Sequence, residues 1–244
     1  MTNSIFTIAQ RIISQLVHDR RTLGLLLIAP LIVASLVGVS VPDKKMLDYT
    51  LPAIMAALIL FFGFLLAGIS FLRERSQGTL ERLMASPVTR LDIVGGYLLG
   101  FLLFAMIQTL IIFFFMIYVM NVSYRGDLWQ ILVFQALIGI AAVCMGTFFS
   151  VFARNEFQMI QFIPLIIVPQ FFLCGLLWPV SQMPEWLQWL ANILPMTYGV
   201  EGIRSMMIQG KGLLDVGTDI IVLVAYAVGM LLLSSLVVRR DNAV

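Results

Sequence analysis

The sequence predicts an all-α polytopic membrane protein with six transmembrane helices, and two observations carry this prediction. Of the 244 residues, 61% are hydrophobic and only 11% are charged, against about 25% charged in soluble domains. Six uncharged stretches are each long enough to cross a bilayer, which takes about 20 apolar residues. These stretches are 23–41, 51–72, 93–120, 128–152, 157–178 and 220–238. We therefore expect residues 1–244 to form a single transmembrane domain.

Residues 4–20, before the first span, predict an amphipathic helix that lies in the membrane interface. Apolar residues recur there at helical spacing: Ile5, Ile8, Ala9, Ile12, Ile13, Leu16 and Val17. Polar residues take the opposite side: Gln10, Arg11, Ser14 and Gln15. Because 22 largely polar or amphipathic residues precede a run that can itself span, we expect this segment to be retained rather than cleaved as a signal.

The segment between the second and third spans, residues 73–90, is a strongly charged stretch. Six of its eighteen residues are charged, so we expect the bilayer to exclude it. A short amphipathic helix is predicted over residues 76–86, because Gly78 and Thr79 can open a helix and Pro87 ends one. Its apolar face comprises Leu80, Leu83 and Met84.

The distribution of basic residues predicts the orientation of the spans. An even number of spans places both termini on one side. Of the 15 Lys and Arg residues, ten fall on that side and five on the other, namely Lys44, Lys45, Arg125, Arg204 and Lys211. By the positive-inside rule, both termini and residues 73–90 are expected in the cytoplasm.

Residues 179–217 have intermediate polarity and predict helices that dip into the outer leaflet before the sixth span, as re-entrant helices, rather than a seventh span. Pro184 suits the first position of a helix that Pro195 ends. A second helix is expected from Thr197 to Gln209, with Gly210 past its end. The apolar and aromatic face of the first helix comprises Trp186, Leu187, Trp189, Leu190, Ile193 and Leu194.

Two kinds of residue within the spans indicate helix contacts or a pathway. Small residues four apart, such as Gly96 and Gly100, favour close helix packing. Prolines in the fifth span predict a bend near a pathway. The candidate pathway residues are Gln158, Gln161, Pro164, Pro169 and Phe171. The alternatives are hydrogen bonds between helices for the glutamines and simple packing for the aromatic ring.

Several function classes are excluded by what the sequence lacks. No predicted span contains Asp, Glu, Lys, Arg or His, which argues against an ion-coupled carrier and an intramembrane metal enzyme. No phosphate-binding loop or hydrolase motif occurs, so we expect no catalytic residue, metal site or cofactor on this chain. The net charge of +2 does not suggest nucleic-acid binding. Cys144 and Cys174 lie in spans and are expected to be small buried hydrophobes.

Two segments resemble signature regions of the ABC-2 type family of bacterial ABC-transporter permeases. One, after the second span, is Gly78-Thr79-Leu80-Glu81 followed by Ser86-Pro87. The other, before the sixth span, is Leu194-Pro195-Met196-Thr197-Tyr198 with Glu201 and Arg204. The short outer loops make the chain similar to the compact exporters of the family, of the daunorubicin-resistance type or of the polysaccharide and teichoic-acid type.

The resemblance implies a permease in the bacterial plasma (inner) membrane that works with other subunits. A second permease subunit would complete a homodimer or heterodimer, and separate ATP-binding cassette ATPase subunits would hold ATP and Mg²⁺. Coupling to the ATPase would use Gly78, Thr79, Leu80, Glu81, Arg82, Leu83 and Met84. The extracellular gate region would comprise Trp186, Trp189, Pro195, Tyr198, Glu201 and Arg204.

The apolar side chains that line nearly every span favour export of an amphiphilic drug-like or lipid-like substrate. Two alternatives stay open: a permease for polysaccharides or lipid-linked glycans, and a non-transporting membrane assembly factor with the same fold. For residues 73–90, the alternative to coupling is an anchor on lipid headgroups.

Overall fold

The computed structural model describes residues 2–79 and 90–240, and these ranges contain helices and no strand. Six helical segments within them are long and apolar enough to cross a membrane. Both findings confirm the predicted class, an all-α polytopic membrane protein.

The first half of the chain forms long helices. Their bounds are α1 Thr2–His18, α2 Arg20–Ser40, α3 Lys44–Ser76, α5 Arg90–Phe114 and α6 Leu128–Ser150. A π-helical turn, η1 Phe115–Val119, extends α5.

The second half contains shorter helices before the last long one. Their bounds are α7 Glu156–Phe162, η2 Ile163–Ile167, α8 Val168–Leu173, η3 Val180–Gln182, α9 Glu185–Ala191, α10 Pro195–Gln209 and α11 Gly217–Arg240. The π-helical turn η2 contains Pro164 near its start and divides the fifth span. The α-helical pattern of this span is therefore interrupted, next to a proline that removes a backbone donor.

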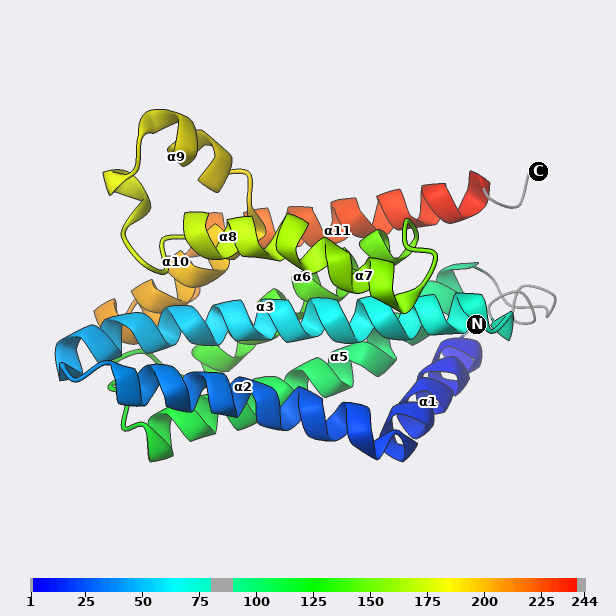
Figure 1. Ribbon diagram of the computed structural model, residues 1–244, viewed down its shortest axis with the longest axis horizontal. Coiled ribbons are helices and arrows are strands. Elements are labelled where there is room, and N and C mark those ends of the chain that lie inside the picture. The colour runs from blue at the N-terminus through cyan, green and yellow to red at the C-terminus, as the bar shows by residue number, and fades with distance from the viewer. Residues whose placement is uncertain (1, 80–89, 241–244) are drawn as a thin grey trace.

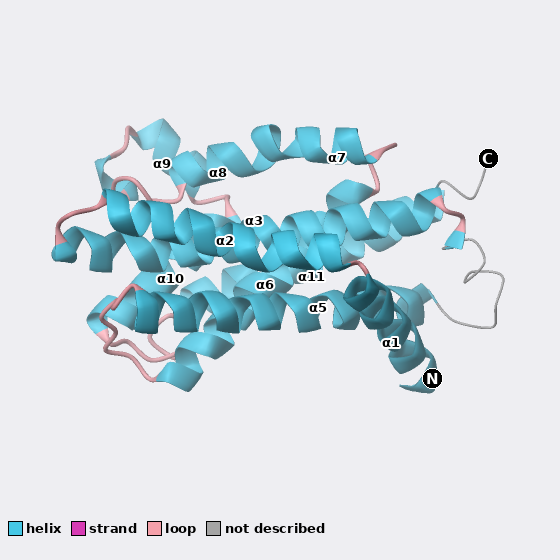
Figure 2. Cartoon of the chain, turned by 60° about the horizontal axis from the view of Figure 1, so that its bottom comes forward, coloured by secondary structure: helices cyan, strands magenta, loops and turns pink. Residues whose placement is uncertain are grey.

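Helices α3 and α6 form the centre of the bundle, and the other long helices surround them (Figures 1 and 2). In the apolar stretch that could cross the membrane, 72% of the residues of α3 and 67% of those of α6 are buried. The corresponding share is 17% in α2, in the fifth span and in α11. Small residues let the two central helices approach: a Cβ added to Gly63 would lie 2.8 Å from the Ala142 Cβ, and one added to Gly146 would collide with the Phe64 carbonyl.

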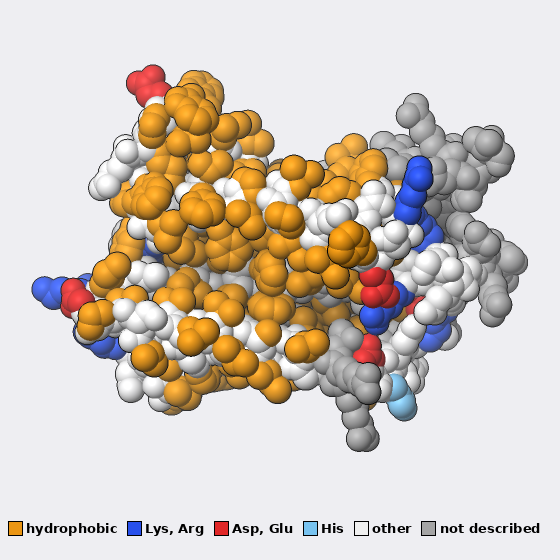
Figure 3. All heavy atoms as spheres, viewed as in Figure 1, with side chains coloured by type: hydrophobic (Ala, Val, Ile, Leu, Met, Phe, Trp, Pro, Cys, Tyr) orange, Lys and Arg blue, Asp and Glu red, His pale blue; other side chains and the backbone are white. Residues whose placement is uncertain are grey.

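The two ends of the bundle differ. Helix α1 lies at one end and runs across the direction of the long helices, beside the last turn of α3; we call this the α1 end (Figure 1). Helices α9 and α10 lie at the opposite end, called here the α9 end. The face seen in Figure 3 is mostly apolar between the ends, and the Lys, Arg, Asp and Glu side chains gather toward the ends. A surface of this kind suits a protein solvated by lipid around its middle.

Helix boundaries differ from the sequence prediction, and three of the differences bear on the candidate sites. Helix α3 continues to Ser76, so Arg73, Glu74 and Arg75 are helical and not part of a loop. The fifth span ends at Leu173 and not at Trp178, because Gly175 adopts a left-handed φ of 81°. Pro195 does not end α9: it begins α10, where its missing N–H has no partner to lose.

Candidate functional site

The last turn of α3 connects several parts of the α1 end through charged side chains. Arg73 donates from Nε to Glu156 Oε1 at 2.6 Å, and its Nη1 lies 3.4 Å from Asp19 Oδ2. Glu156 begins α7, and Asp19 lies between α1 and α2. One guanidinium therefore links α3 to the start of the fifth span and to the turn before the first.

Arg75 links the same turn to the end of α6. Its two terminal nitrogens donate to the carbonyls of Val151 and Ala153, each at 2.6 Å. The last carbonyls of a helix have no partner within it, and a cation is favoured there. Val151 caps the carboxyl end of α6 and Ala153 follows it, so Arg75 ties the turn after α6 to α3.

Glu74 is a buried charge, with 3% of its surface exposed. Its carboxylate forms an ion pair with Arg11 of α1 and accepts a hydrogen bond from the Tyr97 hydroxyl of α5 at 2.7 Å. A buried carboxylate is costly unless it is paired and hydrogen-bonded, and both conditions are met here. These three side chains, the Glu74 cluster, join α1, α3 and α5.

Sequence reasoning missed the Glu74 cluster because it assigned residues 73–90 to a loop. A signal was available: Ala67, Phe71 and Glu74 follow one another at i, i+4 and i+7, the spacing of one helix face. The two apolar members are buried in the structure. No Gly or Pro lies between Gly68 and Gly78, so this face continues through Glu74.

Helix α1 lies in a groove formed by glycines of α5. A Cβ added to Gly96 would lie 2.6 Å from the Ile8 Cβ, and one added to Gly100 would lie 2.8 Å from the Ile12 Cγ2. The predicted small-residue contact is therefore present, and its partner is α1 rather than another long helix. The apolar face of α1 packs on α5.

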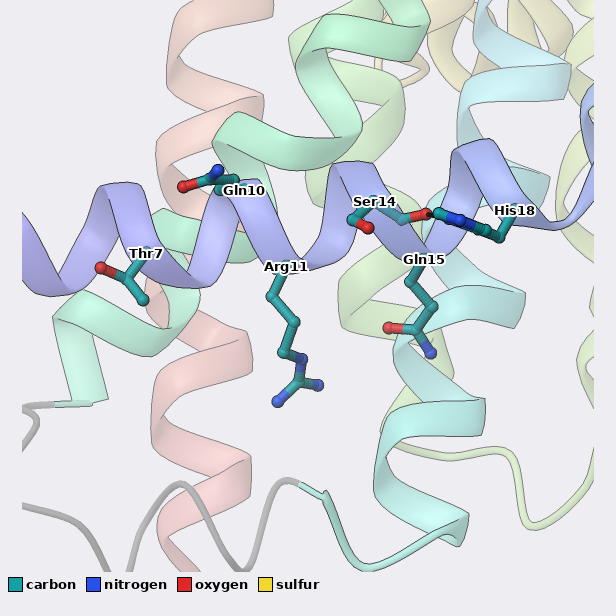
Figure 4. Close-up of a pocket in the computed structure, with 6 residues that line it drawn as sticks. All are labelled: Thr7, Gln10, Arg11, Ser14, Gln15 and His18. Carbon is teal, nitrogen blue, oxygen red and sulfur yellow. Dashed lines mark hydrogen bonds between the residues drawn. The ribbon is translucent and has the colours of Figure 1, made fainter.

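The opposite, polar face of α1 borders a shallow open hollow of about 610 Å³. Figure 4 shows the six side chains that line it, placed along α1. They are Thr7, Gln10, Arg11, Ser14, Gln15 and His18. His18 donates from Nδ1 to the Ser14 carbonyl at 2.6 Å, a bond within α1. The hollow is an accessible polar surface next to the end of α3.

Only the start of the predicted coupling helix lies within the described residues. Gly78 has a left-handed φ of 68°, and its N–H donates to the Arg75 carbonyl at 3.2 Å. It therefore ends α3, as glycines commonly end helices, and does not simply open a new one. The remaining coupling candidates lie outside the described residues: Leu80, Glu81, Arg82, Leu83 and Met84. The Glu74 cluster lies four residues before Gly78 in the chain.

At the α9 end, the six gate-region residues divide into two groups. Trp186 and Trp189 of α9 are 65% and 75% exposed, as expected of side chains that contact lipid. The other four lie on α10: Pro195, Tyr198, Glu201 and Arg204. The Tyr198 hydroxyl donates to the Asn192 carbonyl at 2.8 Å, which ties α10 to the residue after α9.

Glu201 and Arg204 line a pocket of about 270 Å³ between α10, the start of α3 and the end of α8. The Arg204 guanidinium lies 3.8 Å from the centre of the Tyr49 ring and donates to the Gly175 carbonyl at 2.9 Å. Burial lowers the pKa of Arg204, while the electrostatic effect of Tyr49 opposes that shift. Arginine stays charged at physiological pH, so the guanidinium of Arg204 gives the wall of the pocket a positive charge.

The candidate pathway residues do not converge on one cavity. Gln158 accepts from the Arg154 N–H at 2.8 Å, which is a local contact at the start of α7, and Gln161 is exposed. Pro164 and Pro169 are exposed and mark the starts of η2 and α8. Phe171 packs edge-on against Phe61 of α3, with ring centres 6.4 Å apart.

No group of three or more His, Cys, Asp and Glu side chains that could hold a metal ion occurs within residues 2–79 and 90–240. Both cysteines are buried and free, as the sequence predicts.

Comparison with known proteins gives a family match over most of the chain. The profile of the ABC-2 type transporter family matches residues 3–208. The chain is 23% identical over 193 residues to the probable multidrug ABC transporter permease YbhS of Escherichia coli, covering 79% of this chain and 51% of that protein. It is 25% identical over 158 residues to the linearmycin resistance permease protein LnrN of Bacillus subtilis, covering 65% and 41%.

A similar protein also occurs in a eukaryote. The ABC transporter G family member 20 of Dictyostelium discoideum is 28% identical over 172 residues, which covers 70% of this chain and 24% of that protein. The matched region thus spans about half or less of the length of these relatives.

Proposed function

Because the chain belongs to the ABC-2 type transporter family, we propose that it is the membrane-spanning permease subunit of an ATP-binding cassette exporter. A separate ATPase subunit binds ATP and Mg²⁺ and hydrolyses the nucleotide. A second permease subunit, identical or different, completes the membrane part of the transporter. The substrate is amphiphilic, drug-like or lipid-like, and leaves the cell.

The observation that carries this proposal is the set of contacts at the last turn of α3. Arg73, Glu74 and Arg75 bind α1, α5, the end of α6 and the start of α7, directly before the predicted coupling residues. A force applied by an ATPase at residues 78–85 would therefore act on several helices together. Rigid-body transmission of this kind is a recognised way to couple distant sites.

The proposed orientation places the α1 end in the cytoplasm, at the plasma membrane. The support is the excess of Lys and Arg on the side of both termini. The α9 end then faces outward, with the exposed tryptophans Trp186 and Trp189 at the depth of the outer headgroups.

Two observations support an amphiphilic substrate. The predicted spans contain no Asp, Glu, Lys, Arg or His, so a polar cargo finds few partners within the membrane. Two of the relatives carry names that refer to multidrug transport and linearmycin resistance. A substrate of low polarity can reach such a protein from the bilayer itself.

The test is co-purification of an ATPase with the tagged chain from its native membrane in mild detergent. The double substitution Leu83→Asp and Met84→Asp places two charges on the apolar face proposed to dock in a groove of the ATPase. It should reduce recovery of the ATPase at least about tenfold, as expected for loss of a central apolar contact, and leave membrane insertion intact.

The matched control is Leu214→Asp, an apolar-to-acid change at a residue that is 97% exposed at the α9 end. It should leave ATPase recovery unchanged. Retained ATPase binding by the double variant would refute the coupling assignment. A chain that purifies alone under all conditions would favour the membrane assembly factor.

A further inference from the structure

Arg204 joins three separate parts of the α9 end. From α10, its Nε donates to the Tyr49 carbonyl of α3 at 3.2 Å. Its Nη1 and Nη2 donate to the carbonyls of Gly175 and Leu176, at 2.9 and 3.4 Å. These two residues come just after Cys174, the C-cap of α8, so one side chain links α10, α3 and the segment after α8.

All the oxygens that Arg204 contacts belong to neutral carbonyls. Within residues 2–79 and 90–240, no Asp or Glu oxygen forms an ion pair with it, although Glu201 lies one helical turn away. Charge-assisted bonds to carbonyls are weaker than a paired guanidinium and carboxylate. The contact can therefore be released without separating two opposite charges.

The segment held by Arg204 is fastened to α10 at both ends; we call residues 174–194 the outer strap. Gly175 has a left-handed φ of 81°, which turns the chain out of α8 and leaves its carbonyl on Arg204. At the other end, the Thr197 hydroxyl donates to the Ala191 carbonyl at 2.7 Å. Helix α9 lies between these two attachments and stands away from the long helices in Figure 1.

The strap closes one side of the 270 Å³ pocket that Arg204 lines. Cys174, the first residue of the strap, also lines the pocket and is 2% exposed. Its thiol is therefore covered while the attachment at Gly175 and Leu176 is in place.

We propose that Arg204 holds the outer strap closed, and that release of its bonds to Gly175 and Leu176 opens this pocket at the α9 end. The inference rests on the proposed function only where it takes the α9 end as the exit side. Opening then separates the end of α8 from α10 and the start of α3, while the attachment at Thr197 keeps α9 on α10.

The native thiol of Cys174 reports on this opening. In a Cys144→Ala background reconstituted in lipid vesicles, the rate of reaction with a small hydrophilic maleimide measures exposure of Cys174. Arg204→Gln removes the bonds to both Gly175 and Leu176 and should raise that rate at least about tenfold, since loss of one charge-assisted hydrogen bond already shifts an equilibrium by that factor. Arg204→Lys, which keeps the charge but not the planar fork, should give a smaller increase.

Two controls separate local opening from general loosening. In a Cys174→Ala background, the thiol of Cys144, which is fully buried in α6, should stay unreactive in the Arg204→Gln variant. Lys211→Gln, which removes an exposed charge at the same end, should leave labelling of Cys174 unchanged. An unchanged rate at Cys174, or an equal rise at Cys144, would overturn the proposal. If Arg204→Gln does not reach the membrane, Arg204→Lys decides the question in the same way.

A second arm separates this inference from the exporter proposal. Addition of the ATPase subunit with ATP should accelerate labelling of Cys174 in the protein with native Arg204. Acceleration by Arg204→Gln without any effect of ATP would leave the strap proposal standing and count against the exporter. Acceleration by ATP without any effect of Arg204→Gln would support the exporter and overturn the strap proposal.

Discussion

Glu74 shows how much a single buried charge organises at the residue scale. Its carboxylate, on α3, is held by Arg11 of α1 and Tyr97 of α5. Glu156 also pairs with an arginine, Arg73, but 49% of its side chain is exposed. Glu74 and Glu156 thus each pair with an arginine, and the two ion pairs can be compared because Glu74 is buried and Glu156 is exposed to solvent.

Replacing Glu74 by Ala should destabilise the protein by about 1–3 kcal/mol, because Tyr97 loses its buried acceptor and Arg11 its partner. Glu156→Ala should cost less than about 1 kcal/mol, since exposed ion pairs contribute little. The midpoint of thermal unfolding in detergent compares the two variants. Equal shifts would show that the Glu74 cluster is not a special source of stability.

The buried glutamines show what sequence could not predict at this scale. Gln170 donates to the Ile166 carbonyl of its own span at 3.0 Å, and the same amide nitrogen lies 4.0 Å from the sulfur of Met145 in α6. Gln135 donates to the sulfur of Met55 at 2.9 Å, a bond between α6 and α3. Neither amide atom of Gln108 has a partner among the described residues. Hydropathy places a residue in a span, but its partner depends on how neighbouring helices are rotated.

At the scale of elements, the packing of α1 on α5 depends on two glycines. The Gly96-x-x-x-Gly100 spacing predicts that some helix approaches closely, because small residues remove the steric barrier. It does not say which helix. The amphipathic pattern of residues 4–20 likewise predicts a face to be covered without naming the cover. The structure joins the two patterns: the apolar face of α1 fills the glycine groove.

Gly96→Ala should displace α1, because the added Cβ would lie 2.6 Å from the Cβ of Ile8. Overpacking of this kind typically costs 1–3 kcal/mol, so the detached state should become about tenfold more populated. The rate of tryptic cleavage after Arg11 in detergent measures detachment. Gly229→Ala, where an added Cβ meets nothing within 4 Å, is the control and should not change the rate. Equal rates in the two variants would contradict the groove.

At the scale of the whole molecule, hydropathy predicts the number and order of the long helices, since each must satisfy its own backbone in lipid. It predicts their ends less well. Helix α3 continues past the last apolar residue because its charged turn finds partners on five other segments. The gate-region residues were found by resemblance, and the contact of Arg204 with the end of α8 requires the fold.

Orientation is the molecule-scale prediction. In a cysteine-free background, single cysteines replacing Lys44 or Arg125 should react with an impermeant thiol reagent from outside intact cells, because both positions are exposed at the α9 end. A cysteine replacing Ser76, the last residue of α3, should react only after the membrane is opened. The reverse pattern would invert the proposed topology.

The length of α3 has a mechanical consequence. Its 33 residues extend over about 50 Å at 1.5 Å per residue, well beyond the roughly 30 Å hydrocarbon core of a bilayer. The helix is thus a stiff lever that reaches past the membrane. A tilt of about 5° about one end displaces the other by about 4 Å, given that rise per residue. Near one end of α3 the Tyr49 carbonyl accepts a hydrogen bond from Arg204, and near the other end Glu74 pairs with Arg11. A tilt of α3 would therefore strain both contacts at once.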